Sequence, residues 1–298
     1  MESGPTIGVI LNPRANAGRA IQVLPRLADA LAAAEHCYQI HVTTAPGDAS
    51  VAARRFAGQG IELILAVGGD GTINEVANGL LEHGGTRLGI VPAGRGADFM
   101  RTLAPSYRPL SDVAALAAAM PRRVDLGLAT FADGACRAFV NVAGVGFDAE
   151  VARRTARSRL PGRHTPYLAG LATALLGYRN RDMTVTIDGE RVAGPMRAVL
   201  VANGQFFGGG FRIVPAAAID DGVLDVAIIG DIGRLDLVRT VPRLYRGQHT
   251  AHRAFRHLPA RSVRVETAAT ARVELDGELA GYAPVTFTVV PGALLVVA

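Results

Sequence analysis

The sequence predicts a two-domain protein, an α/β domain followed by an antiparallel β-sandwich domain. Three observations carry this prediction: a length of 298 residues, apolar strands alternating with helices over about the first 90 residues, and short strand-like runs between Gly-rich turns after residue 121. A domain commonly has ~100–200 residues, so this length suits two. We expect domains of residues 1–125 and 126–298, and leave open a return of the last residues to the first domain.

The first domain alternates between two hydrophobic periods. Continuous apolar strands separated by amphipathic helices are typical of a parallel sheet with helices on both faces. Strands are expected at residues 6–11, 37–42, 61–67 and 88–91, and helices at 18–35, 49–56 and 73–81.

The sequence pattern of the second domain differs from that of the first. Short strand-like runs recur between Gly and Asp-Gly turns, which indicates an antiparallel sandwich or barrel. Strands are expected at residues 124–129, 137–142, 183–187, 197–202, 223–229, 262–265, 272–275, 285–290 and 293–297, and helical insertions near 149–178 and 235–245.

Composition excludes several kinds of enzyme. The chain contains no Lys, so all 31 of its basic side chains are Arg. This excludes a P-loop lysine, a protein-kinase strand lysine and Schiff-base chemistry. Two distant cysteines suit a reducing cytosol, and no apolar run is long enough to span a membrane. We therefore expect a cytoplasmic protein. The net charge of +5 allows anionic partners but singles out none.

The most informative segment is a glycine loop between an apolar strand and a helix. It reads Gly68, Gly69, Asp70, Gly71, Thr72. Glycines that lead into a helix N-terminus offer free main-chain N–H groups and the positive end of the helix dipole, which suit a phosphate. A second interpretation stays open, in which Thr72 and Glu75 form a capping box that simply begins the helix.

Two further polar turns are predicted at the same edge of the sheet. Residues 12–18 follow the first strand, and residues 92–99 follow the fourth. In an open α/β sheet, ligands bind beyond the carboxyl ends of the strands. Three such turns at one edge therefore favour a ligand site there.

The motifs together resemble the diacylglycerol-kinase catalytic domain of bacterial lipid kinases, a group related to sphingosine kinases and NAD kinases. The matching motifs are Asn12-Pro13 with Gly18, Gly68–Thr72 with Asn74-Glu75-Val76, Pro92-x-Gly94 with Asp98-Phe99 and Arg101, Val124–Gly127, Asn141–Phe147, Gly208–Gly210, Asp220–Asp225, and Asp276-Gly277-Glu278. The resemblance implies a nucleotide-binding α/β domain, a β-sandwich domain, and a cleft between them where ATP phosphorylates a lipid hydroxyl with Mg²⁺.

The resemblance also implies residue roles. The nucleotide-binding residues would be Asn12, Pro13, Gly18, Gly68, Gly69, Asp70, Gly71, Thr72, Glu75, Gly94, Arg95 and Asp98. The catalytic residues would be Asp70, Asp125, Asp276 and the general base Glu278, and a structural Mg²⁺ would be held by Asp221 with the neighbouring carbonyls of Ala218 and Val223. The family usually has Thr and Asn where this chain has Arg95 and Ala97; Arg95 could instead hold a phosphate in bidentate fashion.

The Asp-Gly-Glu motif occurs twice, and physical reasoning does not distinguish the copies. Asp188-Gly189-Glu190 and Asp276-Gly277-Glu278 both lie between strand-like runs, where Asp-Gly is a strong hairpin signal. At least one copy is expected to be only a turn. The order of the family's motifs selects the later one, and with it Glu278.

An acid-free, Arg-rich stretch over residues 151–181 is either a solvated helix face or a contact with an anionic membrane. It also lacks the acidic residue that a dinucleotide fingerprint at residues 144–149 would need. Aromatic residues do not interleave with the arginines, so nucleic acid is not expected. His249, His252 and His257 are expected on the surface.

The sequence thus predicts a lipid kinase that uses ATP and Mg²⁺ and acts on a diacylglycerol-like lipid at the membrane surface. Two alternatives stay open: an NAD-kinase-like enzyme with a soluble acceptor, and an inactive nucleotide- or lipid-binding protein. A homodimer is also left open.

Overall fold

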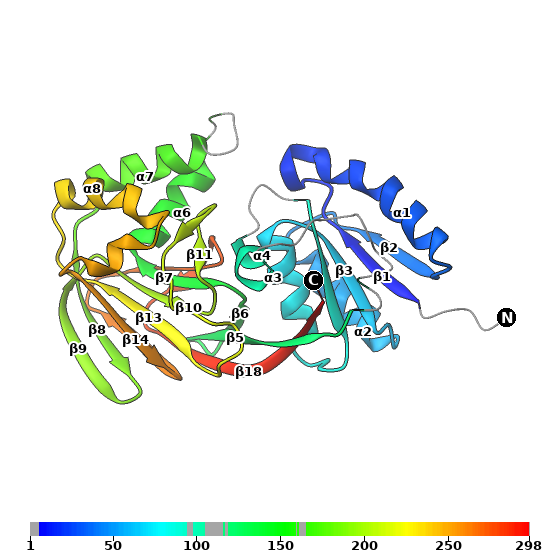
Figure 1. Ribbon diagram of the computed structural model, residues 1–298. Coiled ribbons are helices and arrows are strands. Elements are labelled where there is room, and N and C mark those ends of the chain that lie inside the picture. Colours follow the sequence, from blue (N-terminus) through cyan, green and yellow to red (C-terminus); the bar gives the residue numbers. More distant parts are fainter. Residues whose placement is uncertain are drawn as a thin grey trace. The chain divides into compact units, whose positions relative to one another are not determined.

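The computed structural model describes residues 6–93, 98–104, 116, 119–158, 160 and 165–297 (Figure 1). It divides into two compact units: residues up to Asp125 together with those from Gly292 onward, and Leu126–Pro291. The chain passes between the units twice, within strand β5 (Arg122–Phe131) and within strand β18 (Val285–Val297). Each unit is described by itself below.

The first unit contains a sheet in the order β2-β1-β3-β4-β18, in which all neighbouring strands run parallel. Helices separate the strands in the sequence, and the predicted α/β fold class is confirmed. The elements before β5 are β1 (Ile7–Leu11), η1 (Ala15–Val23), α1 (Leu24–Ala33), β2 (Tyr38–Val42), α2 (Asp48–Gly58), β3 (Leu63–Gly68), α3 (Asp70–Leu80), β4 (Arg87–Pro92) and α4 (Asp98–Leu103).

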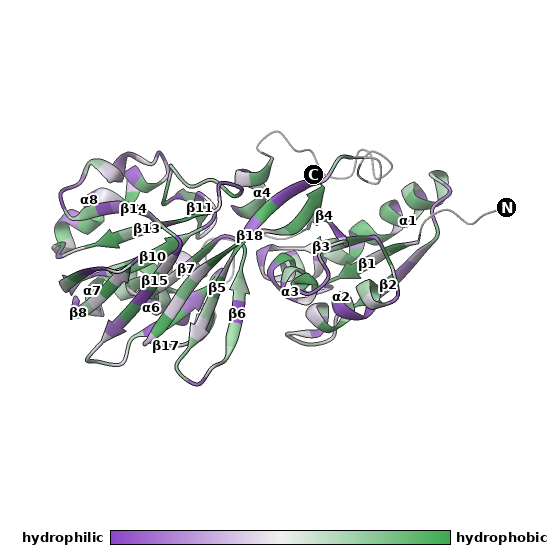
Figure 2. Ribbon diagram, turned by 90° about the horizontal axis from the view of Figure 1, so that it is seen from below, coloured by the Kyte–Doolittle hydropathy of each residue, from purple (hydrophilic) through white to green (hydrophobic). Residues whose placement is uncertain are grey.

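The central strands of this sheet are buried on both faces, which explains their continuous apolar sequences. Strand β3 reads Leu-Ile-Leu-Ala-Val-Gly and is buried throughout, and Figure 2 shows such strands mainly in green. Val9 and Leu65 share a core cluster with Leu27 of α1. Successive strand residues point to opposite faces. Gly8 therefore faces the other side, where a Cβ would overlap the Phe56 ring of α2.

The helix expected over residues 18–35 begins differently in the structure. A 3-10 helix, η1, runs to Val23, and α1 begins only at Leu24. Pro25 then stands in the first turn of α1, where its missing N–H breaks no intrahelical bond. Asn16 and Ala17 adopt left-handed φ angles of 54° and 56°, so the chain is not helical just before residue 18.

The second unit contains two antiparallel sheets, which confirms the predicted β-sandwich. One has the order β14-β13-β10-β7-β16-β17, and the other contains β9, β8, β15 and the first half of β18. The elements are β6 (Cys136–Phe139), β7 (Val142–Gly146), α6 (Phe147–Arg157), α7 (Thr165–Gly177), β8 (Arg181–Ile187), β9 (Glu190–Met196), β10 (Ala198–Ala202), β11 (Phe206–Phe207), β12 (Phe211–Arg212), β13 (Leu224–Ile229), α8 (Arg234–Leu244), η2 (Gln248–Ala251), β14 (Phe255–Ala260), β15 (Ser262–Thr267), β16 (Arg272–Leu275) and β17 (Glu278–Tyr282).

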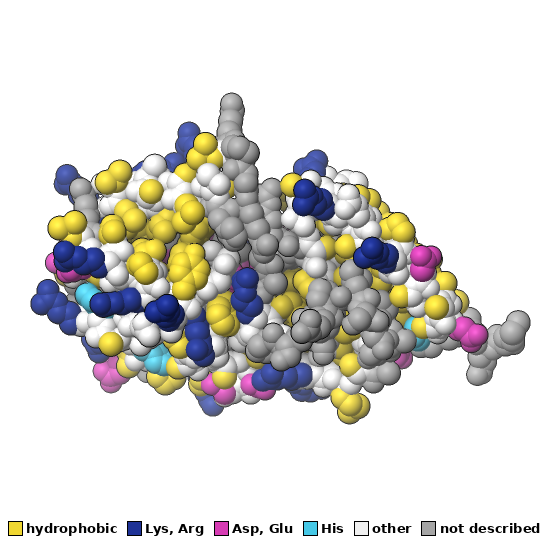
Figure 3. All heavy atoms as spheres, turned by 45° about the horizontal axis from the view of Figure 1, so that its top comes forward, with side chains coloured by type: hydrophobic (Ala, Val, Ile, Leu, Met, Phe, Trp, Pro, Cys, Tyr) yellow, Lys and Arg dark blue, Asp and Glu magenta, His cyan; other side chains and the backbone are white. Residues whose placement is uncertain are grey.

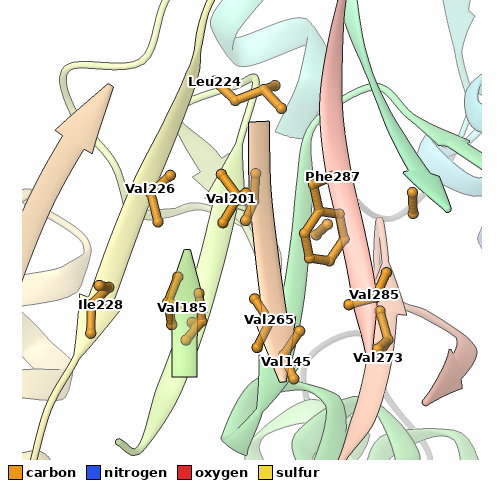
Figure 4. Close-up of a cluster of buried hydrophobic side chains, with 14 of the residues drawn as sticks. Val145, Val185, Val201, Leu224, Val226, Ile228, Val265, Val273, Val285 and Phe287 are labelled. Atoms are coloured by element: carbon orange, nitrogen blue, oxygen red, sulfur yellow. The ribbon is translucent and has the colours of Figure 1, made fainter. Parts of the chain in front are cut away.

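The core of the second unit lies between its two sheets. Val201 and Val226 of one sheet belong to the same buried cluster as Val265 and Phe287 of the other (Figure 4). The Phe287 ring meets Phe139 edge-to-face, with centroids 6.0 Å apart. Such a pair contributes about 0.5–1.5 kcal/mol beyond the area that it buries. This core fixes the strands that carry the second set of predicted site residues.

Two predicted strand boundaries in this unit are wrong. The strand expected over residues 137–142 is divided into β6 and β7, because the Asp276 carboxylate accepts the main-chain N–H groups of Val140, Asn141 and Val142. The strands expected at 285–290 and 293–297 are one strand, β18, which continues through Gly292 at φ 55°.

Candidate active site

The three predicted loops of the first unit meet at one edge of its sheet. Strands β1, β3 and β4 are parallel neighbours, so their carboxyl ends lie together. Asn12 Nδ2 donates to Thr72 Oγ1 at 3.1 Å, which joins the first loop to the second. Phe99 N–H donates to Asp70 Oδ1 at 3.3 Å, which joins the second to the third. The structure thus brings these loop residues together as one hydrogen-bonded cluster.

The other predicted nucleotide residues of the first two loops lie in or beside this cluster and differ in exposure. Pro13, Gly69 and Gly71 are half-buried, and Gly18 is exposed. Gly68 is buried at the end of β3, where a Cβ would overlap the Thr72 side chain. The strand can therefore pass into the helix this closely only with Gly at that position.

The capping-box interpretation is wrong. Helix α3 begins at Asp70 with Gly69 as N-cap, and no described side chain caps it. Glu75 instead accepts the N–H of Ala49 at 3.1 Å and so satisfies a main-chain donor in the first turn of α2. The first turn of α3 thus keeps main-chain N–H groups without a side-chain cap. An anion is favoured at such a helix N-terminus.

The third loop is described in part. Gly94 and Arg95 lie outside the described residues. Asp98 is 5% exposed and forms an ion pair with Arg101 one turn later in α4. Asp125, 3% exposed on β5, accepts the Gly292 N–H at 2.7 Å. Both predicted carboxylates are therefore buried within the first unit.

The predicted catalytic turn of the second unit is anchored by Asp276. Its carboxylate accepts the N–H groups of Val140, Asn141 and Val142 at 2.8–3.0 Å. Its own N–H donates to the Val142 carbonyl at 2.9 Å. A carboxylate that accepts three main-chain donors is held rigidly, because each bond is charge-assisted. Asp276 therefore fixes the turn that leads to Glu278.

Glu278 is half exposed and has a cationic partner that sequence reasoning missed. The Arg137 guanidinium on β6 lies 2.6 Å from the Glu278 carboxylate. The two residues are far apart in the sequence, so no local pattern could have joined them. The ion pair limits the orientations of the Glu278 side chain.

The earlier Asp-Gly-Glu turn has nearly the same backbone geometry. Asp188 and Asp276 have φ angles of 46° and 50°, and both are followed by a left-handed glycine. Asp188 accepts N–H groups of Arg261 and Ser262 at 2.8–3.1 Å, so both aspartates anchor a neighbouring segment. The difference between the turns lies in the glutamates. Glu278 is paired with a guanidinium, whereas Glu190 is exposed and has no ion pair among the described residues.

A second pair of acidic residues, which the sequence analysis did not single out, lies buried behind the later turn. Asp148 of α6 and Glu274 of β16 are 7% and 0% exposed, and their carboxyl groups interact with each other. Burial raises the pKa of Asp148 to about 7. Burial and the neighbouring Asp148 raise the pKa of Glu274 well above its ordinary value. Gly144 makes room for the pair, since a Cβ there would overlap the Asp148 carboxylate.

The predicted metal residues are close in the sequence, with Asp221 exposed and Ala218 and Val223 half-buried. Asp221 Oδ1 accepts the Val223 N–H at 3.2 Å, and Ala218 lies three residues earlier. Nearby Asp225 is 5% exposed; burial raises its pKa, and the Asp221 charge raises it further. Oxygen donors beside two mutually repelling carboxylates fit a hard cation. Within the described ranges, no three His, Cys, Asp or Glu side chains cluster as a metal site.

An apolar pocket lies within the second unit, between helices α6, α7 and α8 and the adjoining sheet. Its wall includes Phe147, Leu171, Leu200 and Phe211. His249 also lines it, and the expectation that His249 lies on the surface is wrong. It is 3% exposed, its Nε2 lies 2.8 Å from the Ile213 carbonyl oxygen, and burial lowers its pKa.

Comparison with known proteins covers both units. A family model of the diacylglycerol kinase catalytic domain matches residues 6–129, and a model of the YegS C-terminal NAD kinase β-sandwich-like domain matches residues 141–298. The chain is 30% identical over 256 residues to a diacylglycerol kinase of Bacillus subtilis strain 168, covering 83% of this chain and 81% of that protein. A diacylglycerol kinase of Mycobacterium tuberculosis strain H37Rv is 32% identical over 243 residues, covering 80% and 77%.

A solved structure is similar over the whole length. A protein of Bacillus anthracis strain Sterne, assigned as a diacylglycerol kinase, superposes with a TM-score of 0.78 at 25% identity, covering 100% of this chain and 98% of that one. Family models thus match both units, and these relatives cover most of the chain. The chain therefore belongs to the bacterial diacylglycerol kinase family of lipid kinases.

Proposed function

We propose that the protein transfers the γ-phosphoryl group of ATP, with Mg²⁺, to a hydroxyl of diacylglycerol or a related lipid. The observation that carries the proposal is the loop cluster of the first unit. There Asn12, Asp70 and Thr72 are joined by hydrogen bonds around a helix N-terminus that no described side chain caps. Such a cluster has the chemistry to bind phosphate oxygens.

In this proposal the first unit binds the nucleotide. The first-turn N–H groups of α3 would donate to phosphate oxygens, and Asp70 would keep the second and third loops in register through Phe99. Because the chain lacks Lys, the positive charge at the phosphates has to come from Arg side chains and a metal. Mg²⁺, when bound, would neutralise charge on the phosphate oxygens.

The second unit would supply the general base. Glu278 would accept the proton of the lipid hydroxyl as its oxygen bonds to the γ-phosphorus; the bond from that phosphorus to the β-phosphate oxygen breaks, and ADP leaves. Arg137 would hold the Glu278 carboxylate in position before the proton arrives. Asp276 would act as a positioning residue, because its carboxylate is occupied by main-chain donors.

The apolar pocket supports a lipid acceptor over a soluble one. Its wall is dominated by Phe, Leu, Ile and Val side chains, which suit acyl chains and would gain little from a nucleotide. NAD would need polar partners for its ribose and phosphate groups.

The surface of the same unit supports contact with an anionic membrane. Leu168 and Leu176 of α7 and Leu235 and Val238 of α8 are 51–74% exposed. Figure 3 shows apolar side chains gathered on this part of the second unit with Arg side chains around them. Within the described ranges, no helix has the length and apolar character that crossing a membrane requires. Apolar contacts with the bilayer and attraction between Arg and anionic headgroups would add to each other.

We also propose that Asp221, with the carbonyls of Ala218 and Val223, holds a structural Mg²⁺. The cation would offset the repulsion between Asp221 and buried Asp225. Chelation should then lower the melting temperature of the native chain and leave Asp221→Asn unchanged. Equal shifts in both would contradict this site.

The test of the proposed function is phosphoryl transfer from labelled ATP to a panel of lipids, with NAD as the soluble acceptor and product mass as readout. The two turns provide matched variants: Glu278→Gln and Glu190→Gln. Loss of a general base costs about 10²-fold or more in kcat, and we expect this for Glu278→Gln with little change for Glu190→Gln.

Three outcomes would contradict the proposal. Phosphorylated NAD without phosphorylated lipid would indicate the soluble acceptor. ATP binding with no product on any acceptor would indicate an inactive binding protein. A larger loss in Glu190→Gln than in Glu278→Gln would move the base to the earlier turn.

A further inference from the structure

A polar pocket with a volume of about 310 Å³ lies within the second unit, apart from the apolar pocket. Three arginines, one glutamate, two tyrosines, a threonine and a glycine line it: Arg153, Arg181, Arg272, Glu150, Tyr178, Tyr282, Thr270 and Gly146. Arg272 and Tyr282 are opposite each other in the β16–β17 hairpin, at its open end, away from the Asp276 turn. Four residue steps of ~3.3 Å each lead from Arg272 to Asp276, so Arg272 lies about 13 Å along the strand from the proposed catalytic turn.

Two of the three guanidinium groups lack an acidic partner. Arg181 begins β8 and donates to the Thr270 carbonyl at 2.9 Å. Arg272 begins β16 in the other sheet and donates to the Tyr282 hydroxyl at 2.7 Å. Neither forms an ion pair with a described residue. Each guanidinium has five N–H donors, so most of their donors are not used by these bonds.

The third arginine of the pocket has an acidic partner. Arg153 makes two hydrogen bonds to Glu150, at 2.7 and 2.8 Å, and Arg154 makes another at 2.6 Å. Hydrogen bonding to Arg153, and then to Arg154, lowers the pKa of Glu150 to about 2, so it stays ionised. Glu150 offsets one of these two positive charges, and Arg181 and Arg272 add two more that have no acidic partner among the described residues.

Tyr178 adds a buried donor at the same place. It is 8% exposed, and its hydroxyl proton has no acceptor among the described residues. Burial raises the pKa of Tyr178 to about 12, so the proton is retained at neutral pH. The hydroxyl lies beside Gly146, another residue of the pocket wall. A buried donor without an acceptor points to a ligand that brings one.

We propose that this pocket binds the phosphate group of an anionic ligand, with Arg181 and Arg272 as its two cationic contacts. Two guanidinium groups from two different sheets can share the oxygens of a tetrahedral phosphate, and planar carboxylates have fewer oxygens to offer. The ligand is either the headgroup of an anionic phospholipid or a soluble phosphate compound. The site is separate from the nucleotide loops, and its occupancy does not depend on phosphoryl transfer.

The test compares Arg181→Gln/Arg272→Gln with a matched control, Arg191→Gln/Arg256→Gln, which removes two exposed strand arginines of the same unit outside the pocket. Inorganic phosphate is titrated by calorimetry. Flotation with phosphatidylcholine vesicles, with and without phosphatidic acid, tests the headgroup. Because the first unit can also bind phosphate, the readout is the difference between the two variants. Thermal midpoints check folding, and Arg272→Gln replaces the double variant if that one unfolds.

Loss of the charge-assisted bonds should weaken binding by about tenfold or more, which corresponds to at least about 1.4 kcal/mol. Weaker phosphate binding with unchanged flotation supports a soluble ligand. Weaker flotation on vesicles with phosphatidic acid, with phosphate titrations unchanged, supports a lipid headgroup. If the pocket variant and the control variant bind phosphate and vesicles equally well, the proposal is overturned.

Discussion

Replacing Asp148 with Asn should make the stability of the second unit less dependent on pH. Burial disfavours charge on both Asp148 and Glu274, and the Asp148 charge adds to the effect on Glu274. An Asn amide at position 148 has nearly the same shape and carries no charge at any pH. The pH dependence that Asp148 causes is then removed, and its charge no longer raises the pKa of Glu274.

The size of the effect follows from the pKa of Asp148, which is 3.8 in its ordinary state and about 7 when folded. A group whose pKa is raised on folding gives the highest stability below its unfolded pKa, and stability falls as pH rises toward the folded value. This interval spans about three pH units at ~1.4 kcal/mol each, so the loss is about 4 kcal/mol. The raised pKa of Glu274 extends the decline to higher pH.

The assay is urea unfolding followed by circular dichroism from about pH 5 to pH 8, since the chain has no Trp to report by fluorescence. We expect the midpoint of the native chain to fall over this range and that of Asp148→Asn to fall less. Glu266→Gln, which alters a strand glutamate outside the buried pair, is the control. Equal pH slopes in the native chain and Asp148→Asn would refute buried Asp148 as the cause.

Three further changes test the local geometry. Gly68→Ala places a Cβ against the Thr72 side chain and should lower the free energy of unfolding in thermal denaturation by about 1–3 kcal/mol. Gly58→Ala, where the added Cβ meets open space, should be neutral or slightly stabilising. Asp276→Ala leaves three main-chain donors without their acceptor and should lower the free energy of unfolding, measured in urea, by about 3 kcal/mol or more. The matched change at the exposed turn, Asp188→Ala, should lower it by about 1 kcal/mol. Equal losses would contradict the stronger anchoring at the later turn. Burial lowers the pKa of His249, so this residue by itself reduces stability as pH falls below about 6.5, opposite in sign to the effect of Asp148. The stability of His249→Gln relative to the native chain should therefore rise as pH falls from about 7 to about 5. A difference between the two that does not change with pH would show that the histidine is not responsible.

The sequence predicted features that depend on local pattern. The alternation of periods gave the parallel sheet, because strands buried on both faces must be apolar throughout. Both Asp-Gly turns occur as hairpins with left-handed residues, since Asp and Gly tolerate positive φ. The edge of the sheet where Asn12, Asp70 and Thr72 meet followed from parallel topology.

The sequence could not reveal contacts set by packing between distant segments. Arg137 reaches Glu278 across 141 residues, and Asp148 meets Glu274 behind a glycine whose role is steric. Glu75 has the sequence spacing from Thr72 that a capping box requires, yet the helix begins earlier, at Asp70, and Glu75 bonds to Ala49 because α2 packs beside α3. Each of these depends on which elements become neighbours, and that is decided by the whole fold.

The path of β18 has a consequence for how the molecule is made. Residues Leu295–Val297 complete the parallel sheet beside β4, although every residue of the second unit precedes them in the chain. During translation, the edge of β4 therefore stays unpaired until residues 295–297 have been made, after all the strands of the second unit. The sheet of the first unit is completed last even though its synthesis began first, and a chain truncated before residue 295 would keep that edge unpaired.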